Sequence, residues 1–142
     1  MTPGDRTARR LVDMTVYPEE QVYEPPPQVA CERLVIPIDL TDELKLQTVQ
    51  YIYRGLVVRF AIMLYYASGG GSIAEVSRID TCHGTVHRHR FKEEFDEELG
   101  DPQIIHRILV DGSEWEVVNS HYDQQLDRMI DEAEEYFRRW RR

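Results

Sequence analysis

Residues suited to acid–base chemistry gather between positions 78 and 89 of the chain. Arg78 and Asp80 are separated by one residue, as are His87 and His89, and the dipeptide His83-Gly84 lies between the two pairs. Residues two apart in a β-strand point to the same face. A two-residue hairpin loop at His83-Gly84 would place Asp80 opposite His87 and Arg78 opposite His89. A longer loop would change this pairing, although each pair would keep its common face.

These residue types suit proton transfer on a phosphodiester. A histidine titrates near neutrality and can give or take a proton. A carboxylate opposite the ring orients it and stabilises its charged form, while an arginine binds phosphate and stabilises developing negative charge. The predicted catalytic residues for metal-independent RNA cleavage, by internal attack of the 2′-hydroxyl, are therefore His87, His89, Asp80 and Arg78.

The charge distribution leaves room for an anionic substrate near this hairpin. The whole chain of 142 residues has a formal net charge of −9, which by itself argues against a dedicated nucleic-acid-binding protein. Residues 54–92, however, contain six basic and two acidic residues, a net charge of +4. We expect RNA to be held there by electrostatic attraction, and the predicted substrate-binding residues are Arg88, Arg90, Arg59 and His83.

Two other interpretations stay open. His87, His89 and Asp80 form a two-histidine, one-carboxylate set that could hold a metal ion, with His83 as a further ligand. The neighbouring Arg78 disfavours a cation, so no cofactor is expected. Alternatively, the same residues are solvated cross-strand pairs of a non-catalytic interaction or assembly protein, which binds a protein partner or a second copy through the sheet face and the N-terminal segment.

An antiparallel sheet would have to position these residues. Segments rich in β-branched and aromatic residues are separated by turn signals such as Gly69-Gly70-Gly71, and an edge strand is interrupted by Pro37. Besides this edge strand over 34–38, the pattern predicts an antiparallel meander of four strands over 46–53, 56–67, 73–82 and 85–91.

The remainder of the chain predicts helices and one more hairpin. A short helix is expected over 92–99, and a hairpin with strands over 104–110 and 114–118 is expected around Asp111-Gly112. From Ser120 onward, apolar residues recur at spacings of three and four, which is typical of a long amphipathic helix. The predicted fold class is α+β, an antiparallel meander sheet with the C-terminal helix packed on one face.

The composition also bounds organisation and location. Five of the seven prolines lie in the first 27 residues, which predicts an extended arm over 1–30 and a single α+β domain over 31–142. The two cysteines, Cys31 and Cys82, form no CxxC pair and fit a reducing cytoplasm. The longest apolar run is the eight residues of 60–67, far short of the about 20 needed to span a bilayer. A cytoplasmic protein without membrane contact is expected, and a homo-oligomer could form through the arm.

The string Arg78-Ile79-Asp80, followed by His83 and by His87-Arg88-His89, resembles a pattern Arg-(Tyr or Ile)-Asp, His, His-x-His. Small prokaryotic proteins of the TumE toxin type share this pattern, as do related short families of unknown function. The resemblance covers residues 45–91. It implies a single-sheet α+β domain, a toxin-like role for the quoted arginine, aspartate and histidines, and a DNA-binding antitoxin as partner. The spacing between Asp80 and His87 is shorter here than in the toxin pattern.

Overall fold

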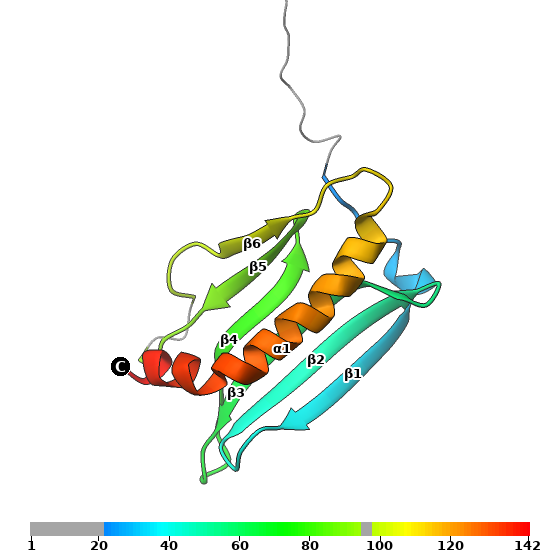
Figure 1. The fold of residues 1–142 in the computed structure, drawn as a ribbon. Coiled ribbons are helices and arrows are strands. Elements are labelled where there is room, and N and C mark those ends of the chain that lie inside the picture. The colour runs from blue at the N-terminus through cyan, green and yellow to red at the C-terminus, as the bar shows by residue number, and fades with distance from the viewer. Residues whose placement is uncertain (1–21, 95–97) are drawn as a thin grey trace, which may run out of the picture.

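A computed structural model describes residues 22–94 and 98–142 and shows one sheet and one long helix (Figure 1). Within these residues a short 3-10 helix, η2 (Gln28–Ala30), precedes the sheet, and α1 (Glu114–Arg141) follows it. The sheet is antiparallel and its strands follow chain order: β1 (Glu32–Asp39), β2 (Leu44–Tyr53), β3 (Leu56–Ala67), β4 (Ile73–Cys82), β5 (Thr85–Arg90) and β6 (Gln103–Arg107). The predicted α+β meander is confirmed.

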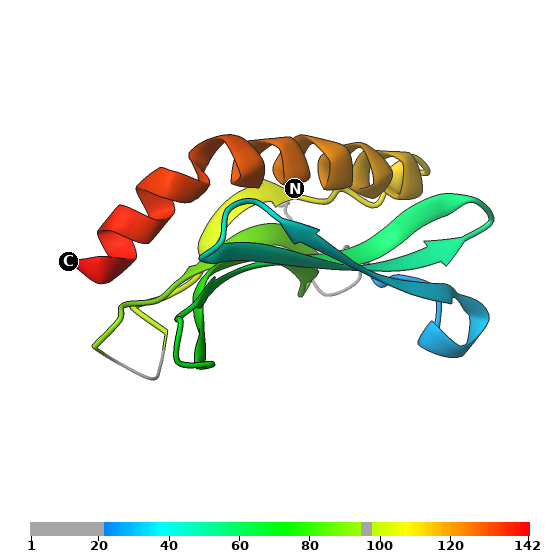
Figure 2. The same cartoon turned by 90° about the horizontal axis from the view of Figure 1, so that it is seen from below.

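Helix α1 lies across one face of the sheet, so the described part of the molecule has two layers (Figure 2). The alternation of side chains sends Phe60 and Ile62 of β3 under the helix, where both are buried. Helix residues at spacings of three and four, such as Tyr122, Gln125 and Met129, cover them. The opposite face of the sheet carries no α-helix among the described residues. We call it the open face.

The predicted strand over 114–118 is wrong, because these residues form the first turns of α1. The helix begins at Glu114, with Ser113 as the residue before it, rather than at Ser120. Asp111 organises the entry, since its Oδ1 atom accepts a hydrogen bond from the Ser113 backbone N–H at 3.0 Å. Trp115 then packs edge-on against the Tyr53 ring at 5.2 Å. This packing places residue 115 on the helix face that covers the sheet.

The predicted helix over 92–99 is also not observed. Residues 92–94 and 98–99 are not helical, and 95–97 lie outside the described residues. The Leu99 backbone N–H donates to the Arg90 carbonyl oxygen at 2.7 Å, and the Glu93 N–H donates to the Trp140 carbonyl oxygen at 2.9 Å. The bond from Leu99 to β5 thus takes a donor that a helix over 92–99 would have used, and the bond from Glu93 ties the start of this segment to α1.

The last part of the predicted N-terminal arm is attached to the β4–β5 hairpin, whereas residues 1–21 lie outside the described residues. Tyr23 is buried, and its hydroxyl donates a hydrogen bond to the Val58 carbonyl oxygen at 2.6 Å. A Cβ atom at Gly84 would lie 3.1 Å from Val22 Cγ1 and 3.2 Å from the Tyr23 nitrogen. Gly84 therefore permits the close approach of segment and turn.

The approach at Gly84 predicts a position-specific loss of stability. Gly84 and Gly112 both have a positive φ, +76° and +97°, but a Cβ at Gly112 would meet no atom within 4 Å. Gly112→Ala should lower the free energy of unfolding by about 1 kcal/mol from backbone strain alone. Gly84→Ala should lower it by about 2 kcal/mol, because residues 22–23 must also move. Urea unfolding of both variants measures the difference, and equal losses would contradict the close approach.

Candidate functional site

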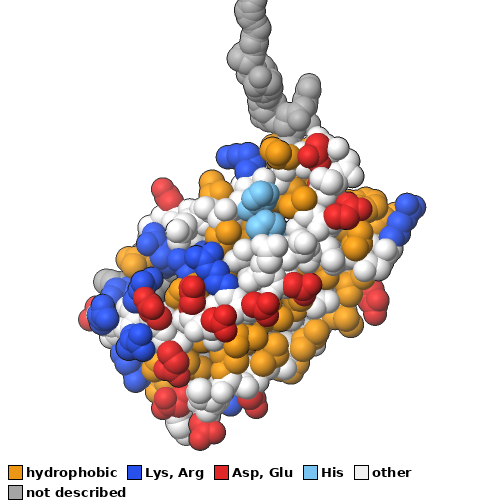
Figure 3. All heavy atoms as spheres, viewed as in Figure 1, with side chains coloured by type: hydrophobic (Ala, Val, Ile, Leu, Met, Phe, Trp, Pro, Cys, Tyr) orange, Lys and Arg blue, Asp and Glu red, His pale blue; other side chains and the backbone are white. Residues whose placement is uncertain are grey.

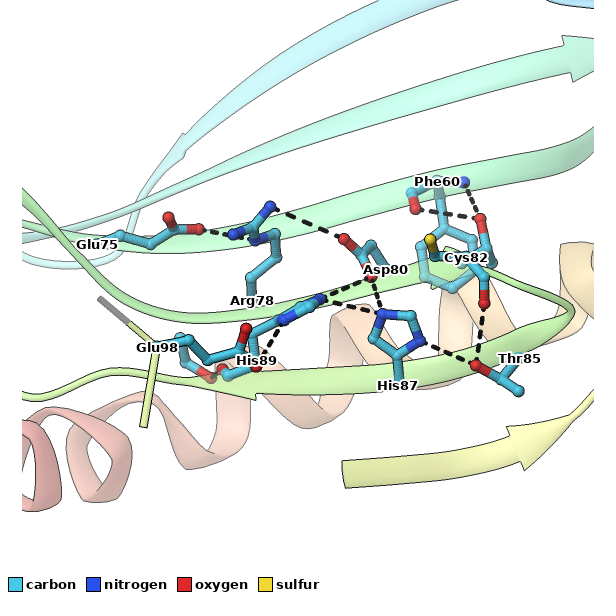
Figure 4. Close-up of polar contacts among 11 residues, drawn as sticks. Phe60, Glu75, Arg78, Asp80, Cys82, Thr85, His87, His89 and Glu98 are labelled. Atoms are coloured by element: carbon cyan, nitrogen blue, oxygen red, sulfur yellow. Dashed lines mark hydrogen bonds and ion pairs between the residues drawn. The ribbon is translucent and has the colours of Figure 1, made fainter. Parts of the chain in front are cut away.

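The β4–β5 hairpin has the register that a two-residue loop predicts. Asp80 pairs with His87 and Arg78 pairs with His89. His83 and Gly84 both have a positive φ, +53° and +76°, as the tight turns that suit a twisted hairpin require. Because alternate residues of β4 enter the core beneath α1, the four polar side chains lie on the open face (Figure 4).

Three side-chain atoms converge at the centre of this group (Figure 4). His87 Nε2 lies 2.8 Å from Asp80 Oδ1 and 3.0 Å from His89 Nε2. His89 Nε2 lies 3.3 Å from the same Asp80 oxygen. The side chains of His87, His89 and Asp80 are 7%, 15% and 16% exposed. We call these three residues the triad.

The other ring nitrogen of each histidine has its own partner, which assigns the tautomer. Thr85 Oγ1 donates its one hydrogen to the Cys82 carbonyl oxygen at 3.0 Å. It can therefore only accept a hydrogen from His87 Nδ1, which lies 2.9 Å away. The Glu98 carboxylate accepts from His89 Nδ1 at 2.7 Å. With the hydrogen on Nδ1, the Nε2 atom of each neutral ring carries a lone pair.

The centre of the triad thus brings together three electron-pair donors. Two imidazole lone pairs and a carboxylate oxygen repel one another at these distances unless a cation or a shared proton lies among them. Asp80 Oδ1 is buried and accepts no hydrogen bond from the described residues. Burial lowers the pKa of His87 and the neighbouring His89 lowers it further, although Asp80 acts in the opposite direction. Burial therefore favours the neutral ring of His87, the form that binds a metal ion.

Arg78 lies beside the triad rather than at its centre. Its Nε atom is 3.1 Å from Glu75 Oε2, and its Nη1 atom is 3.9 Å from Asp80 Oδ2. Burial raises the pKa of Glu75, and Arg78 partly offsets this effect. The charged groups that the structure describes in and beside the triad are the carboxylates of Asp80, Glu75 and Glu98 and the guanidinium of Arg78. Carboxylates thus outnumber the guanidinium at this place, which favours a cation over an anion.

The predicted substrate-binding residues lie in two separate places. Arg59 and His83 line a pocket of about 300 Å³, together with Cys82 and the segment around Tyr23. Cys82 follows Asp80 by two residues on the same strand face, so this pocket adjoins the triad. Arg88 and Arg90 instead line a pocket beside α1. They lie on the other face of β5 from His87 and His89.

Sequence reasoning missed two residues of the site, Thr85 and Glu98. Thr85 carried a usable signal, because it precedes His87 by two residues and must share its face in a strand. Glu98 carried none, since it reaches His89 through a chain reversal after β5 rather than through a regular spacing. The sequence thus predicted the triad but not the anchors of both rings.

Comparisons with models of protein families, with curated proteins and with solved structures found no match to this chain. The fold and the site define it as an α+β meander protein with a largely buried two-histidine, one-carboxylate cluster on an open sheet face. In residues 22–94 and 98–142, no helix has both the length and the apolar character needed to cross a membrane.

A second histidine pair lies away from the triad, between β6 and α1. The rings of His106 and His121 are 4.5 Å apart between centroids, and Gln125 Nε2 lies 3.2 Å from His121 Nδ1. Burial lowers the pKa of His121, and His106 lowers it further. The folded protein therefore binds a proton at residue 121 less readily than the unfolded chain does.

This pair predicts a loss of stability in mild acid. Above the unfolded histidine pKa of about 6.5 the lowered pKa of His121 has no effect, and below it protonation favours the unfolded chain. His121→Gln should therefore lose less stability than the wild type between pH 7.5 and pH 5.5. Urea unfolding at the two pH values measures this, with His106→Gln as a variant expected to show part of the same change. Identical pH dependence in wild type and His121→Gln would contradict the assignment.

Proposed function

We propose that this protein binds one divalent transition-metal ion through Asp80 Oδ1, His87 Nε2 and His89 Nε2. The observation that carries the proposal is the convergence of these three atoms within 3.3 Å, with no hydrogen available between the neutral rings. Two histidines and one carboxylate are a known ligand set for such ions. Thr85 and Glu98 hold the far nitrogens of both rings, as partners of metal-binding histidines commonly do.

The reaction we propose is hydrolysis of a phosphodiester, with RNA as the substrate class. Three protein ligands leave coordination positions for water and substrate. A bound ion would make water a stronger nucleophile at neutral pH and would polarise a phosphoryl oxygen. Arg59 and His83 line the pocket beside the triad, where a guanidinium suits phosphate. The basic segment 54–92 and the resemblance of residues 78–89 to toxin-type proteins support RNA over other phosphodiesters.

A second candidate is metal-independent RNA cleavage by the same residues. The 2.8 Å contact between His87 Nε2 and Asp80 Oδ1 favours it, because a protonated His87 would donate a hydrogen bond to that carboxylate. His87 and His89 would then exchange protons with the 2′-hydroxyl and the leaving oxygen, and Arg78 would stabilise the phosphorane charge. A toxin of this kind would be held inactive by an antitoxin.

Metal binding is tested by stoichiometry. Protein freed of metal with a chelator should bind one equivalent of Co²⁺ or Zn²⁺. Bound Co²⁺ should show d–d absorption bands in the visible range that indicate coordination by nitrogen and oxygen. Asp80→Ala and His89→Ala should abolish this binding, while Glu98→Gln should weaken it about 10–100-fold because His89 loses its charged anchor. His106→Ala is the matched control, as it removes a histidine from the pair outside the triad. Unchanged stoichiometry in His87→Ala/His89→Ala would refute the site.

Cleavage of a single-stranded RNA separates the candidate functions. The metal-dependent mechanism predicts that EDTA abolishes cleavage and that added metal restores it. Metal-independent cleavage predicts activity in EDTA and a 2′,3′-cyclic phosphate product. His87→Ala/His89→Ala should reduce cleavage at least 100-fold in either case, with His106→Ala as the control. RNA left intact by wild type in every condition would favour the non-catalytic interaction protein.

A further inference from the structure

A second polar pocket lies on the helix face, between β5 and the C-terminal half of α1. It encloses about 190 Å³, and its walls combine basic and aromatic side chains. The residues that matter here are Arg88, Arg90, Lys92, Arg139, Tyr136 and Trp140. Figure 3 shows how charge is distributed over this surface. Acidic side chains follow the outer side of α1, whereas basic side chains gather toward its C-terminal end.

Arg88 is the distinctive residue of this pocket. It is only 8% exposed, and its guanidinium lies 4.7 Å from the centre of the Tyr136 ring. Its Nη2 atom donates to Gln103 Oε1 at 2.8 Å, whereas its buried Nε has no hydrogen-bond partner among the described residues.

The buried charge of Arg88 forms no ion pair with the residues that the structure describes. Among residues 22–94 and 98–142, no carboxylate lies within ion-pair distance of its guanidinium. The neighbouring Glu132 accepts the hydroxyl hydrogen of Tyr136 instead. A buried guanidinium with an unpaired N–H is costly unless an anion completes it. Arg88 thus places a fixed, largely desolvated positive charge in the wall of the pocket, which favours an anionic ligand.

The surrounding groups add charge and apolar surface. Lys92 Nζ donates to the Arg139 carbonyl oxygen at 3.3 Å, which leaves two further hydrogens for a ligand. Arg139 pairs with Glu135 on the outer side of the helix, and Arg90 is exposed at the rim. Tyr136 and Trp140 are buried and supply aromatic walls. This combination fits a phosphate group attached to a flat, apolar body.

We propose that this pocket binds a small phosphate monoester, with the phosphate beside the Arg88 guanidinium and the Lys92 ammonium and the organic part against Tyr136 and Trp140. The site lies on the opposite sheet face from the triad, so it goes beyond the proposed function and does not depend on it. A planar guanidinium matches a phosphate with two parallel N–H groups. Arg88 is then a ligand-binding residue rather than a contact for the substrate of the triad.

Phenyl phosphate is a suitable probe, measured by titration calorimetry in EDTA so that no metal at the triad can hold it. Wild type should bind phenyl phosphate and bind inorganic phosphate at least threefold more weakly, because the latter lacks the aromatic ring. Arg88→Gln should weaken binding of phenyl phosphate at least tenfold. Arg54→Gln is the matched control, since Arg54 lies over the Tyr53 ring elsewhere on the surface.

A rim variant keeps the test decisive if Arg88→Gln does not fold by circular dichroism. Arg90→Gln/Lys92→Gln leaves the buried guanidinium in place and should weaken phenyl phosphate binding at least threefold. No binding to wild type, or equal binding to wild type and either variant, would overturn the proposal. Loss of metal at the triad would leave this binding intact, so the two sites fail independently.

Discussion

The two-residue turn at His83-Gly84 is the constraint on which the rest of the site depends. Side chains in a strand alternate between faces, so a shift of one residue in the β4–β5 register would move His87 and His89 beneath α1. The left-handed conformation of both turn residues fixes the register. Gly84 also lets the segment around Tyr23 lie against the turn. The same short sequence thus sets the polar cluster and closes one end of the neighbouring pocket.

The alternation along β5 separates two kinds of chemistry within three residues. His87 and His89 face the open side with Asp80, whereas Arg88 between them points toward α1. The two residues Glu98 and Leu99, which follow β5, contribute to both faces of the sheet: Glu98 contacts His89 on the open face, and Leu99 lines the pocket of Arg88 on the helix face. One thin sheet therefore carries electron-pair donors on one face and a buried cation on the other, and the backbone between them keeps the opposed groups apart.

Local patterns predicted the sheet well and the segments around it less well. The strands 56–67 and 73–82 and the hairpin register followed from β-branched residues, alternation and a two-residue loop. The start of α1 was misjudged because Asp111-Gly112 is a hairpin signal and because Trp115 and Val117 alternate with glutamates as in a strand. The predicted helix over 92–99 was wrong at its described ends. The prediction rested on the local spacing of apolar residues, whereas the backbone of Glu93 and Leu99 is held by hydrogen bonds to segments distant in the sequence.

The sequence by itself determined that Arg78 shares a sheet face with Asp80, and that His87 shares one with His89, because side chains alternate along a strand. It favoured one common face for both pairs through a two-residue loop, and the observed turn at His83-Gly84 decided that register. Tertiary structure alone decided what the group can do. Thr85 and Glu98 take the Nδ1 hydrogens and turn both Nε2 lone pairs toward Asp80. Glu98 reaches its place only because the chain folds back on β5. The packing of α1 likewise decided that Arg88 is buried without a counterion among the described residues, since burial depends on elements far apart in the chain.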